Sequence, residues 1–203
     1  MTSLGGRPIV LASASATRAA ILAGAGIEVL TDPAGIDEDE IKRSFRAAGR
    51  DAAACATALA ETKALRVSAR HTDALVVGAD QMLDCAGTWF DKSRDRSEAR
   101  AQLIALRGKR HELVSALAVV RNGAPIWRLV DRPRLTMRAF SDRFLEAYLA
   151  ALGDDALASV GVYQLEGLGA QLFERIEGDY FSILGLPLLP LLGFLRGHGV
   201  VPS

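Results

Sequence analysis

The sequence predicts an α/β protein built on a mixed β-sheet, and three observations support this prediction. Short apolar segments typical of strands alternate with helix-forming segments along the first half of the chain. The dipeptide Asn122-Gly123 separates two strand-like segments, which indicates a hairpin and therefore antiparallel pairing. The chain of 203 residues contains no internal repeat and no low-complexity linker. We therefore expect residues 1–203 to form a single domain.

In the first half of the chain, apolar runs predict strands and capping residues predict where helices begin. A helix is expected to start near Arg18, directly after the first apolar run. The acidic run at 37–40 suits the first turn of a helix, and Asp51 can cap a long alanine-rich helix that ends at about residue 70. Strands are expected at residues 8–12, 27–30 and 74–78.

In the second half, similar signals predict further helices and the antiparallel part of the sheet. A helix over 97–106 is expected to stop at Gly108, and a second one to begin after Ser141 and end before Gly153. Glycines among strand-like pieces of the final third suggest tight turns near a ligand. The apolar segment 183–195 is too short and too interrupted for a membrane span, so we expect a buried turn and a C-terminal helix. Strands are expected at 112–120 and 126–137.

Composition excludes several classes of protein. Lys and Arg together number 24, and Asp and Glu together also number 24, so no basic excess points to a nucleic-acid or membrane-surface partner. The two cysteines, Cys55 and Cys85, have no metal-ligand or redox spacing and suit a reducing compartment. The N-terminus lacks the pattern of a secretory signal. We expect a cytoplasmic protein that binds a small molecule.

The turn between the first strand and the first helix is the most informative stretch. It places Ser13, Ser15 and free backbone N–H groups at a helix N-terminus, with Arg18 one turn inside. Such a turn can bind an anion, and phosphate is the expected ligand. The alternative is an ordinary strand–helix turn in which Ser15 caps the helix and Arg18 is solvated.

Asp80 is the sharpest candidate among the carboxylates. It follows the apolar run 74–78, and open α/β sheets bind ligands at the carboxyl ends of strands. There it can hold a divalent metal or activate water for attack on phosphorus. The alternative is a turn-forming or capping Asp. The other candidates are the carboxylates Glu38, Asp84 and Asp91 and the phosphate contacts Arg18, Lys63, Lys92 and Arg94.

Motifs in order along nearly the whole chain, from about residue 8 to residue 196, make it similar to the Maf proteins. They are Leu11-Ala12-Ser13-x-Ser15-x-x-Arg18, Asp37-Glu38, Ala60-x-x-Lys63-Ala64, Gly78-Ala79-Asp80-Gln81, Asp91-Lys92, Gly108-x-x-His111, Gly161-Val162-Tyr163-Gln164-Leu165-Glu166-Gly167-x-Gly169-Ala170, Gly178-Asp179-Tyr180 and Gly185-Leu186-Pro187-Leu188.

The resemblance implies a nucleoside triphosphate pyrophosphatase that cuts between the α- and β-phosphates and requires Mg²⁺ or Mn²⁺. The implied fold has two lobes around an elongated mixed sheet, with a nucleotide cleft, in a homodimer. Asp80 would be the general base and, with Glu38, would hold the metal. The implied phosphate-binding residues are Ser13, Arg18, Lys63 and Lys92.

Three positions, Thr17, Gln81 and Glu166, bear on the choice of nucleotide. Gln81 and Glu166 resemble the branch of the family that hydrolyses 7-methyl-GTP. The chemistry agrees with this resemblance, since a carboxylate can accept from guanine N1–H and N2–H₂ and suits a positively charged ring. Thr17 stands where that branch usually has an aromatic residue. The alternatives are a dTTP/UTP pyrophosphatase of the same family, a nucleotide-binding regulator of septum formation without turnover, and a different phosphate enzyme. The absence of a Walker-type loop opposes the last.

Overall fold

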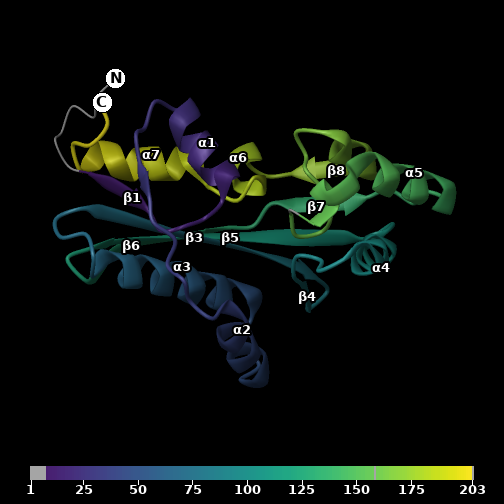
Figure 1. Ribbon diagram of the computed structural model, residues 1–203, viewed down its shortest axis with the longest axis horizontal. Helices are drawn as coiled ribbons and strands as arrows, with labels where there is room; N and C mark the ends of the chain where they lie inside the picture. Colours follow the sequence, from purple (N-terminus) through teal and green to yellow (C-terminus); the bar gives the residue numbers. More distant parts are fainter. Residues whose placement is uncertain (1–7, 158, 203) are drawn as a thin grey trace. The chain divides into compact units, whose positions relative to one another are not determined.

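The computed structural model describes residues 8–157 and 159–202, and it confirms an α/β fold with a mixed sheet (Figure 1). The described strands follow the order β2-β1-β3-β5-β7-β8, with β4 paired to β3 and β6 paired to β5. Strand β1 runs parallel to β2 and β3, whereas the β3–β4, β5–β6, β5–β7 and β7–β8 pairs are antiparallel.

Every element of the described residues has defined bounds. The strands are β1 (Ile9–Leu11), β2 (Leu30–Thr31), β3 (Leu75–Cys85), β4 (Thr88–Phe90), β5 (Arg110–Arg121), β6 (Ala124–Asp131), β7 (Arg134–Met137) and β8 (Phe173–Glu177). The α-helices are α1 (Ala16–Gly24), α2 (Glu38–Ala47), α3 (Ala52–Ser68), α4 (Arg96–Leu106), α5 (Asp142–Leu152), α6 (Tyr180–Ile183) and α7 (Leu188–Gly197). Short 3₁₀ helices cover Gly153–Leu157 and Leu168–Leu172.

The chain divides into two compact units, and the first comprises residues up to 81, 115–131 and 179 onward. Its sheet is covered on both faces. Helices α1 and α7 lie on one face, where Leu22, Leu117 and Leu191 belong to one buried cluster (Figure 1). Helix α3 lies on the other face, where Ala64 and Val67 pack in a second cluster. Because both faces are covered, β1 and the start of β3 are continuously apolar.

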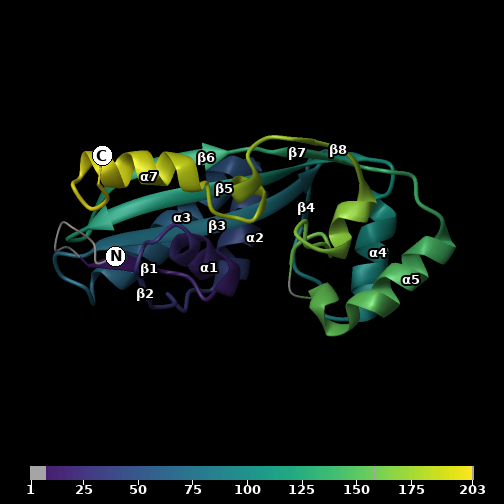
Figure 2. The same ribbon diagram turned by 90° about the horizontal axis from the view of Figure 1, so that it is seen from above.

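The second unit comprises residues 82–114 and 132–178. Helices α4 and α5 lie side by side in it (Figure 2). Strand β7 pairs with β5 on one side and with β8 on the other. Leu103, Leu135 and Leu145 are fully buried in this unit. The two units accord with the two lobes that the resemblance implies, and the single domain expected over residues 1–203 stays a prediction.

The predicted helix starts are confirmed, because capping depends on residues close in sequence. Asp37, Asp51 and Ser141 each accept a hydrogen bond from the backbone N–H three residues on. Gly153 ends α5 with a φ of 58°. The C-terminal helix is α7, and within the described ranges no helix has both the length and the apolar character needed to cross a membrane.

Three strand predictions were wrong in their limits. The segment 27–30 forms a strand only at Leu30–Thr31, because the N–H of Ile27 instead closes the end of α1 on Leu22. The segment 126–137 is two strands, since Pro133 has no N–H to continue the ladder. Strand β3 does not stop at residue 78, because pairing with β5 and, at 83–85, antiparallel pairing with β4 prolong it. Asp80 and Gln81 therefore lie inside a strand, not beyond its end.

Candidate active site

Two serines stabilise the turn between β1 and α1 by accepting hydrogen bonds within it. Ser15 Oγ accepts from the N–H of Arg18 at 3.3 Å and caps α1, as the alternative interpretation of this turn holds. Buried Ser13 Oγ accepts from the N–H of Ser15 at 3.2 Å and from Arg18 Nη1 at 3.1 Å. The turn is thus a capped helix start whose arginine folds back onto it.

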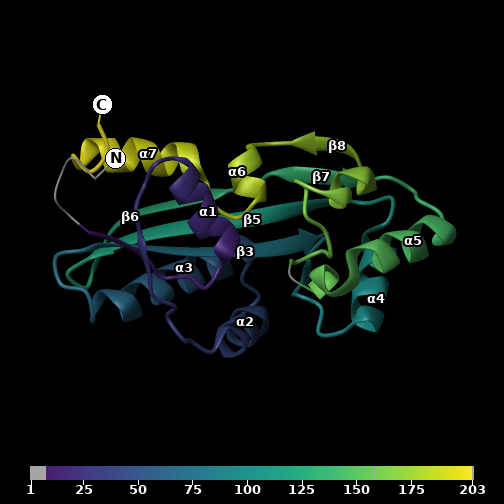
Figure 3. The ribbon, with the colours of Figure 1, turned by 45° about the horizontal axis from the view of Figure 1, so that its top comes forward.

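Arg18 is not a solvated side chain. Its Nε donates to the carbonyl of Gly185 at 2.8 Å, and its Nη1 donates to the carbonyl of Ala79 at 3.1 Å. Figure 3 shows α6, which precedes Gly185, beside the first turn of α1. Burial lowers the pKa of the Arg18 guanidinium, and the charges of Asp80 and Glu38 raise it in opposition. Because guanidinium stays protonated in proteins, Arg18 is a fixed positive charge held in one orientation.

Arg18 occupies a gap along one edge of β3. On this edge Val77 is the last residue paired with β1, and Leu83 is the first paired with β4. Between them the Ala79 carbonyl bonds the guanidinium rather than another strand. This interruption leaves a short stretch of the strand edge without a strand partner next to the helix N-terminus, and Asp80 lies within this buried stretch.

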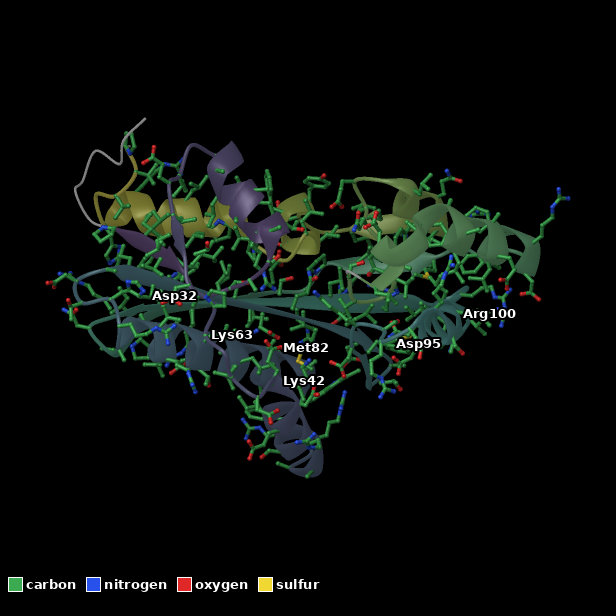
Figure 4. All side chains as sticks on the ribbon, viewed as in Figure 1. Asp32, Lys42, Lys63, Met82, Asp95 and Arg100 are labelled. Carbon is green, nitrogen blue, oxygen red and sulfur yellow. The ribbon has the colours of Figure 1, made fainter. Side chains whose placement is uncertain are left out.

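Lys63 of α3 joins the two carboxylates of the site. Its Nζ lies 2.7 Å from Asp80 Oδ1 and 2.8 Å from Glu38 Oε1. Lys63 and Asp80 are buried, with side chains 10% and 6% exposed, whereas the Glu38 side chain is 42% exposed. Burial raises the pKa of Glu38, but the charges of Lys63, Lys42 and Arg18 outweigh this and hold it below its usual value. Figure 4 labels Lys63 on α3 and Lys42 on α2.

Gly78 allows the close approach that brings Lys63 to Asp80. A Cβ at Gly78 would overlap the carbonyl oxygen of Ala60 and lie 2.9 Å from the Ala64 methyl group. Alternation along β3 puts Gly78 and Asp80 on the same face, and helical spacing puts Ala60 and Lys63 on one face of α3. Small residues on both elements therefore set the distance between the ammonium and the carboxylate.

Asp80 keeps one oxygen available. Its Oδ2 is buried, and none of the residues that the structure describes is hydrogen-bonded to it. No group of three or more His, Cys, Asp or Glu gathers for a metal ion within the described residues. Two carboxylates nevertheless suit Mg²⁺, which commonly takes one or two protein carboxylates and completes its shell with phosphates and water. The donor set of Glu38 and Asp80 fits such an ion.

Gln81 points to the opposite face of β3 from Asp80. Its Nε2 lies 2.9 Å from Ser115 Oγ and donates to the carbonyls of Ser182 and Ile183 at 3.0 Å each. Ser115 Oγ also donates to the Ser182 carbonyl at 2.7 Å. The amide nitrogen of Gln81 thus holds α6, and Gly185, two residues beyond the end of α6, orients Arg18.

The structure brings five of the predicted site residues, all of the first unit, into one cluster. The cluster consists of Ser13, Arg18, Glu38, Lys63 and Asp80. Thr17 is exposed on α1. Exposed Lys92, in an isolated bridge with Val160, and exposed Glu166, in a turn, belong to the second unit.

Sequence reasoning missed two contributors to this cluster, the carbonyl of Gly185 and the small residue Gly78. The carbonyl carries no side-chain signal. A glycine within an apolar strand run does indicate close approach of another backbone, so the role of Gly78 could have been predicted from the sequence.

The fold and this cluster define an α/β protein in which a capped helix start and its arginine lie beside two carboxylates that share a lysine. The family model for Maf-like protein matches residues 8–198, and the chain belongs to this family. A nucleoside triphosphate pyrophosphatase of Granulibacter bethesdensis is 54% identical over 190 residues, which cover 94% of this chain and 96% of that protein. One of Paramagnetospirillum magneticum is 55% identical, covering 94% and 98%. A 7-methyl-GTP pyrophosphatase of Rhizobium meliloti is 48% identical, covering 96% and 98%.

Proposed function

We propose that this protein is a nucleoside triphosphate pyrophosphatase, a hydrolase that releases pyrophosphate and a nucleoside monophosphate. The observation that carries the proposal is the buried carboxylate of Asp80, bound on one oxygen by Lys63 and unpartnered on the other, beside the turn of Ser13 and Arg18. The names of the relatives from Granulibacter bethesdensis and Paramagnetospirillum magneticum support the same activity.

In this proposal the triphosphate binds to donors that the fold already orients. The N-terminus of α1 offers backbone N–H groups and the positive end of its dipole, and Arg18 and Lys63 add fixed charges. Lys92 adds a further cation. Preorganised donors cost no reorganisation during reaction, which is the main source of electrostatic catalysis.

Asp80 is proposed as the general base. A water molecule on Oδ2 transfers a proton to this oxygen, and the water oxygen attacks the α-phosphorus. The bond between the α-phosphorus and the bridging αβ oxygen then breaks, and pyrophosphate leaves with the electron pair. Lys63, bound to Oδ1, keeps the carboxylate turned so that Oδ2 faces the water.

A divalent cation, Mg²⁺ or Mn²⁺, is part of the proposal. Glu38 and Asp80 would hold it, and it would neutralise charge on the phosphate oxygens. Charge arithmetic supports this requirement. Arg18 and Lys63 are balanced within the cluster by Glu38 and Asp80, so a triphosphate with about four negative charges needs additional cations.

We further propose that the preferred nucleotide is 7-methyl-GTP. Glu166 is an exposed carboxylate able to accept from the N1–H and N2–H₂ of a guanine. The relative from Rhizobium meliloti carries the name 7-methyl-GTP pyrophosphatase. The dTTP/UTP preference remains the competing candidate within the family, and Thr17 offers no aromatic face for stacking. A cytoplasmic homodimer that binds no nucleic acid completes the proposal.

The test is a panel of 7-methyl-GTP, GTP, UTP and dTTP with separate detection of pyrophosphate and orthophosphate. We expect pyrophosphate only, highest kcat/KM for 7-methyl-GTP, and loss of turnover when a chelator exceeds the metal. Orthophosphate in place of pyrophosphate would contradict the activity. Equal or better turnover of dTTP would contradict the nucleotide preference alone.

A further inference from the structure

A buried polar pair in the second unit has no part in the chemistry proposed above. His111 of β5 and Tyr163 are 1% and 5% exposed, and His111 Nε2 lies 2.8 Å from the Tyr163 hydroxyl. Phe173 packs against both rings, edge-on to Tyr163 at a centroid distance of 4.8 Å and tilted at 6.0 Å from His111. This hydrogen bond restricts the orientation of both rings, because breaking it would leave the Tyr163 hydroxyl and His111 Nε2 buried without a partner.

Tyr163 anchors the segment that carries Glu166. The preceding residue, Val162, is β-branched and has a φ of 64°, a conformation that such residues rarely adopt. Its carbonyl accepts from the Tyr148 hydroxyl at 2.9 Å, and the Tyr163 carbonyl accepts from Ser159 Oγ at 2.7 Å. Strained backbone persists only where its surroundings enforce it, so this segment is held from several sides.

Beyond Tyr163 the chain closes on itself. The N–H of Gly167 donates to the Gln164 carbonyl at 3.2 Å, and a Cβ at Gly169 would overlap that carbonyl oxygen. Glu166 lies at the exposed part of this turn. The turn over residues 164–169 is therefore a small rigid body, and the Tyr163 side chain is the buried anchor at its start.

We propose that His111 is a positioning residue for nucleotide selection, because its hydrogen bond to Tyr163 fixes the turn that presents Glu166. This inference rests on the proposed function, in which Glu166 reads the base. The pair works between uncharged partners: burial lowers the pKa of His111 to about 4 and raises that of Tyr163. His111 touches no reacting atom in this account and acts only through the turn.

Three variants separate positioning from packing. Tyr163→Phe keeps the ring against Phe173 and deletes the hydroxyl. His111→Leu fills the space without a polar atom, and His111→Gln keeps a side-chain amide able to bond the Tyr163 hydroxyl. Ser68→Ala is the control, because it also deletes a buried hydroxyl, one that accepts from the Gly123 N–H in the first unit. Each protein is assayed for KM and kcat with 7-methyl-GTP and for amide hydrogen exchange over residues 161–169.

Positioning predicts a rise in KM without a matching loss of kcat. For Tyr163→Phe and His111→Leu we expect KM for 7-methyl-GTP to rise about fivefold or more while kcat stays within about twofold, with faster exchange over 161–169. His111→Gln should recover most of the wild-type KM, and Ser68→Ala should keep it. A KM for His111→Leu as low as that of His111→Gln would overturn the inference, since packing alone would then suffice, and so would unchanged exchange in Tyr163→Phe. These results would leave pyrophosphate release by the wild type, and hence the proposed activity, intact. A wild type that releases no pyrophosphate would overturn both.

Discussion

The two units hold their candidate functional side chains in different ways. In the first unit the side chains hold one another: Lys63 binds both Glu38 and Asp80, and Arg18 is bound by Ser13 and two backbone carbonyls. In the second unit Glu166 is exposed, and its placement comes from the backbone of a turn anchored elsewhere. The first arrangement suits chemistry that needs fixed charges, and the second suits recognition of one nucleotide base among several.

This difference predicts different consequences of substitution. A change within an interlocked cluster disturbs every partner, so its cost should appear with all nucleotides. A change at a side chain presented from a turn should appear only with the nucleotide that the side chain recognises. The predictions below use this distinction, beginning with the largest effect.

Asp80→Asn should lower kcat by about 100- to 10,000-fold with every nucleotide, because an amide cannot take a proton from water. Steady-state kinetics with pyrophosphate detection measure the effect, and thermal unfolding checks the fold. Asp32→Asn is the matched control. Asp32 pairs with Arg70 and His71 in the same unit, outside the cluster, so its substitution should leave turnover unchanged. A folded Asp80→Asn protein with most of its activity would move the base elsewhere, first to Glu38.

Glu166→Gln should affect one nucleotide selectively, whereas Gln81→Thr should affect all nucleotides alike. Loss of a charge-assisted hydrogen bond at Glu166 should reduce kcat/KM for 7-methyl-GTP by about tenfold or more while kcat/KM for UTP stays within about twofold. Gln81→Thr should lower kcat for both nucleotides alike, because its amide holds α6 and through it Arg18. The double variant should therefore favour pyrimidine nucleotides at reduced overall turnover. A selective effect of Gln81→Thr would instead assign Gln81 to base reading, as the sequence predicts.

The change expected to affect turnover least concerns stability and pH. Burial lowers the pKa of His111 from 6.5 to about 4. Between these two pKa values His111 is protonated in the unfolded chain but not in the folded chain. The free energy of unfolding therefore falls as pH falls through this range. The wild type should lose up to about 3 kcal/mol more than His111→Gln between pH 7 and pH 4. Urea unfolding at several pH values measures this difference. If the free energies of unfolding of the two proteins fall in parallel with pH, the His111 imidazole is exposed to water and the prediction is contradicted.

Local rules predicted the features that depend on neighbouring residues. Asp37, Asp51 and Ser141 cap helices as expected, since a cap needs only a few residues of sequence. The length of β3 could not be predicted in this way, because it depends on pairing with β5 and, at residues 83–85, with β4. Asp80 lies inside the strand beside β5, which begins only at Arg110 and so gives no signal in the local sequence.

The site was predictable to a similar extent. Ser13 and Arg18 could be placed together from one turn, whereas the meeting of Glu38, Lys63 and Asp80 depends on packing between α3 and β3. The resemblance to Maf proteins grouped these residues where spacing alone could not. The bond from Arg18 to the Gly185 carbonyl joins residues 167 positions apart and had no sequence signal.

Hydrolysis in ¹⁸O-labelled water tests the central claim most directly. The wild type is given a nucleoside triphosphate with a divalent cation, and the products are weighed by mass spectrometry. Attack of water on the α-phosphorus, with Asp80 as base, predicts one ¹⁸O atom in the nucleoside monophosphate and none in the pyrophosphate. Label in the pyrophosphate, or release of orthophosphate and a nucleoside diphosphate, would contradict the account.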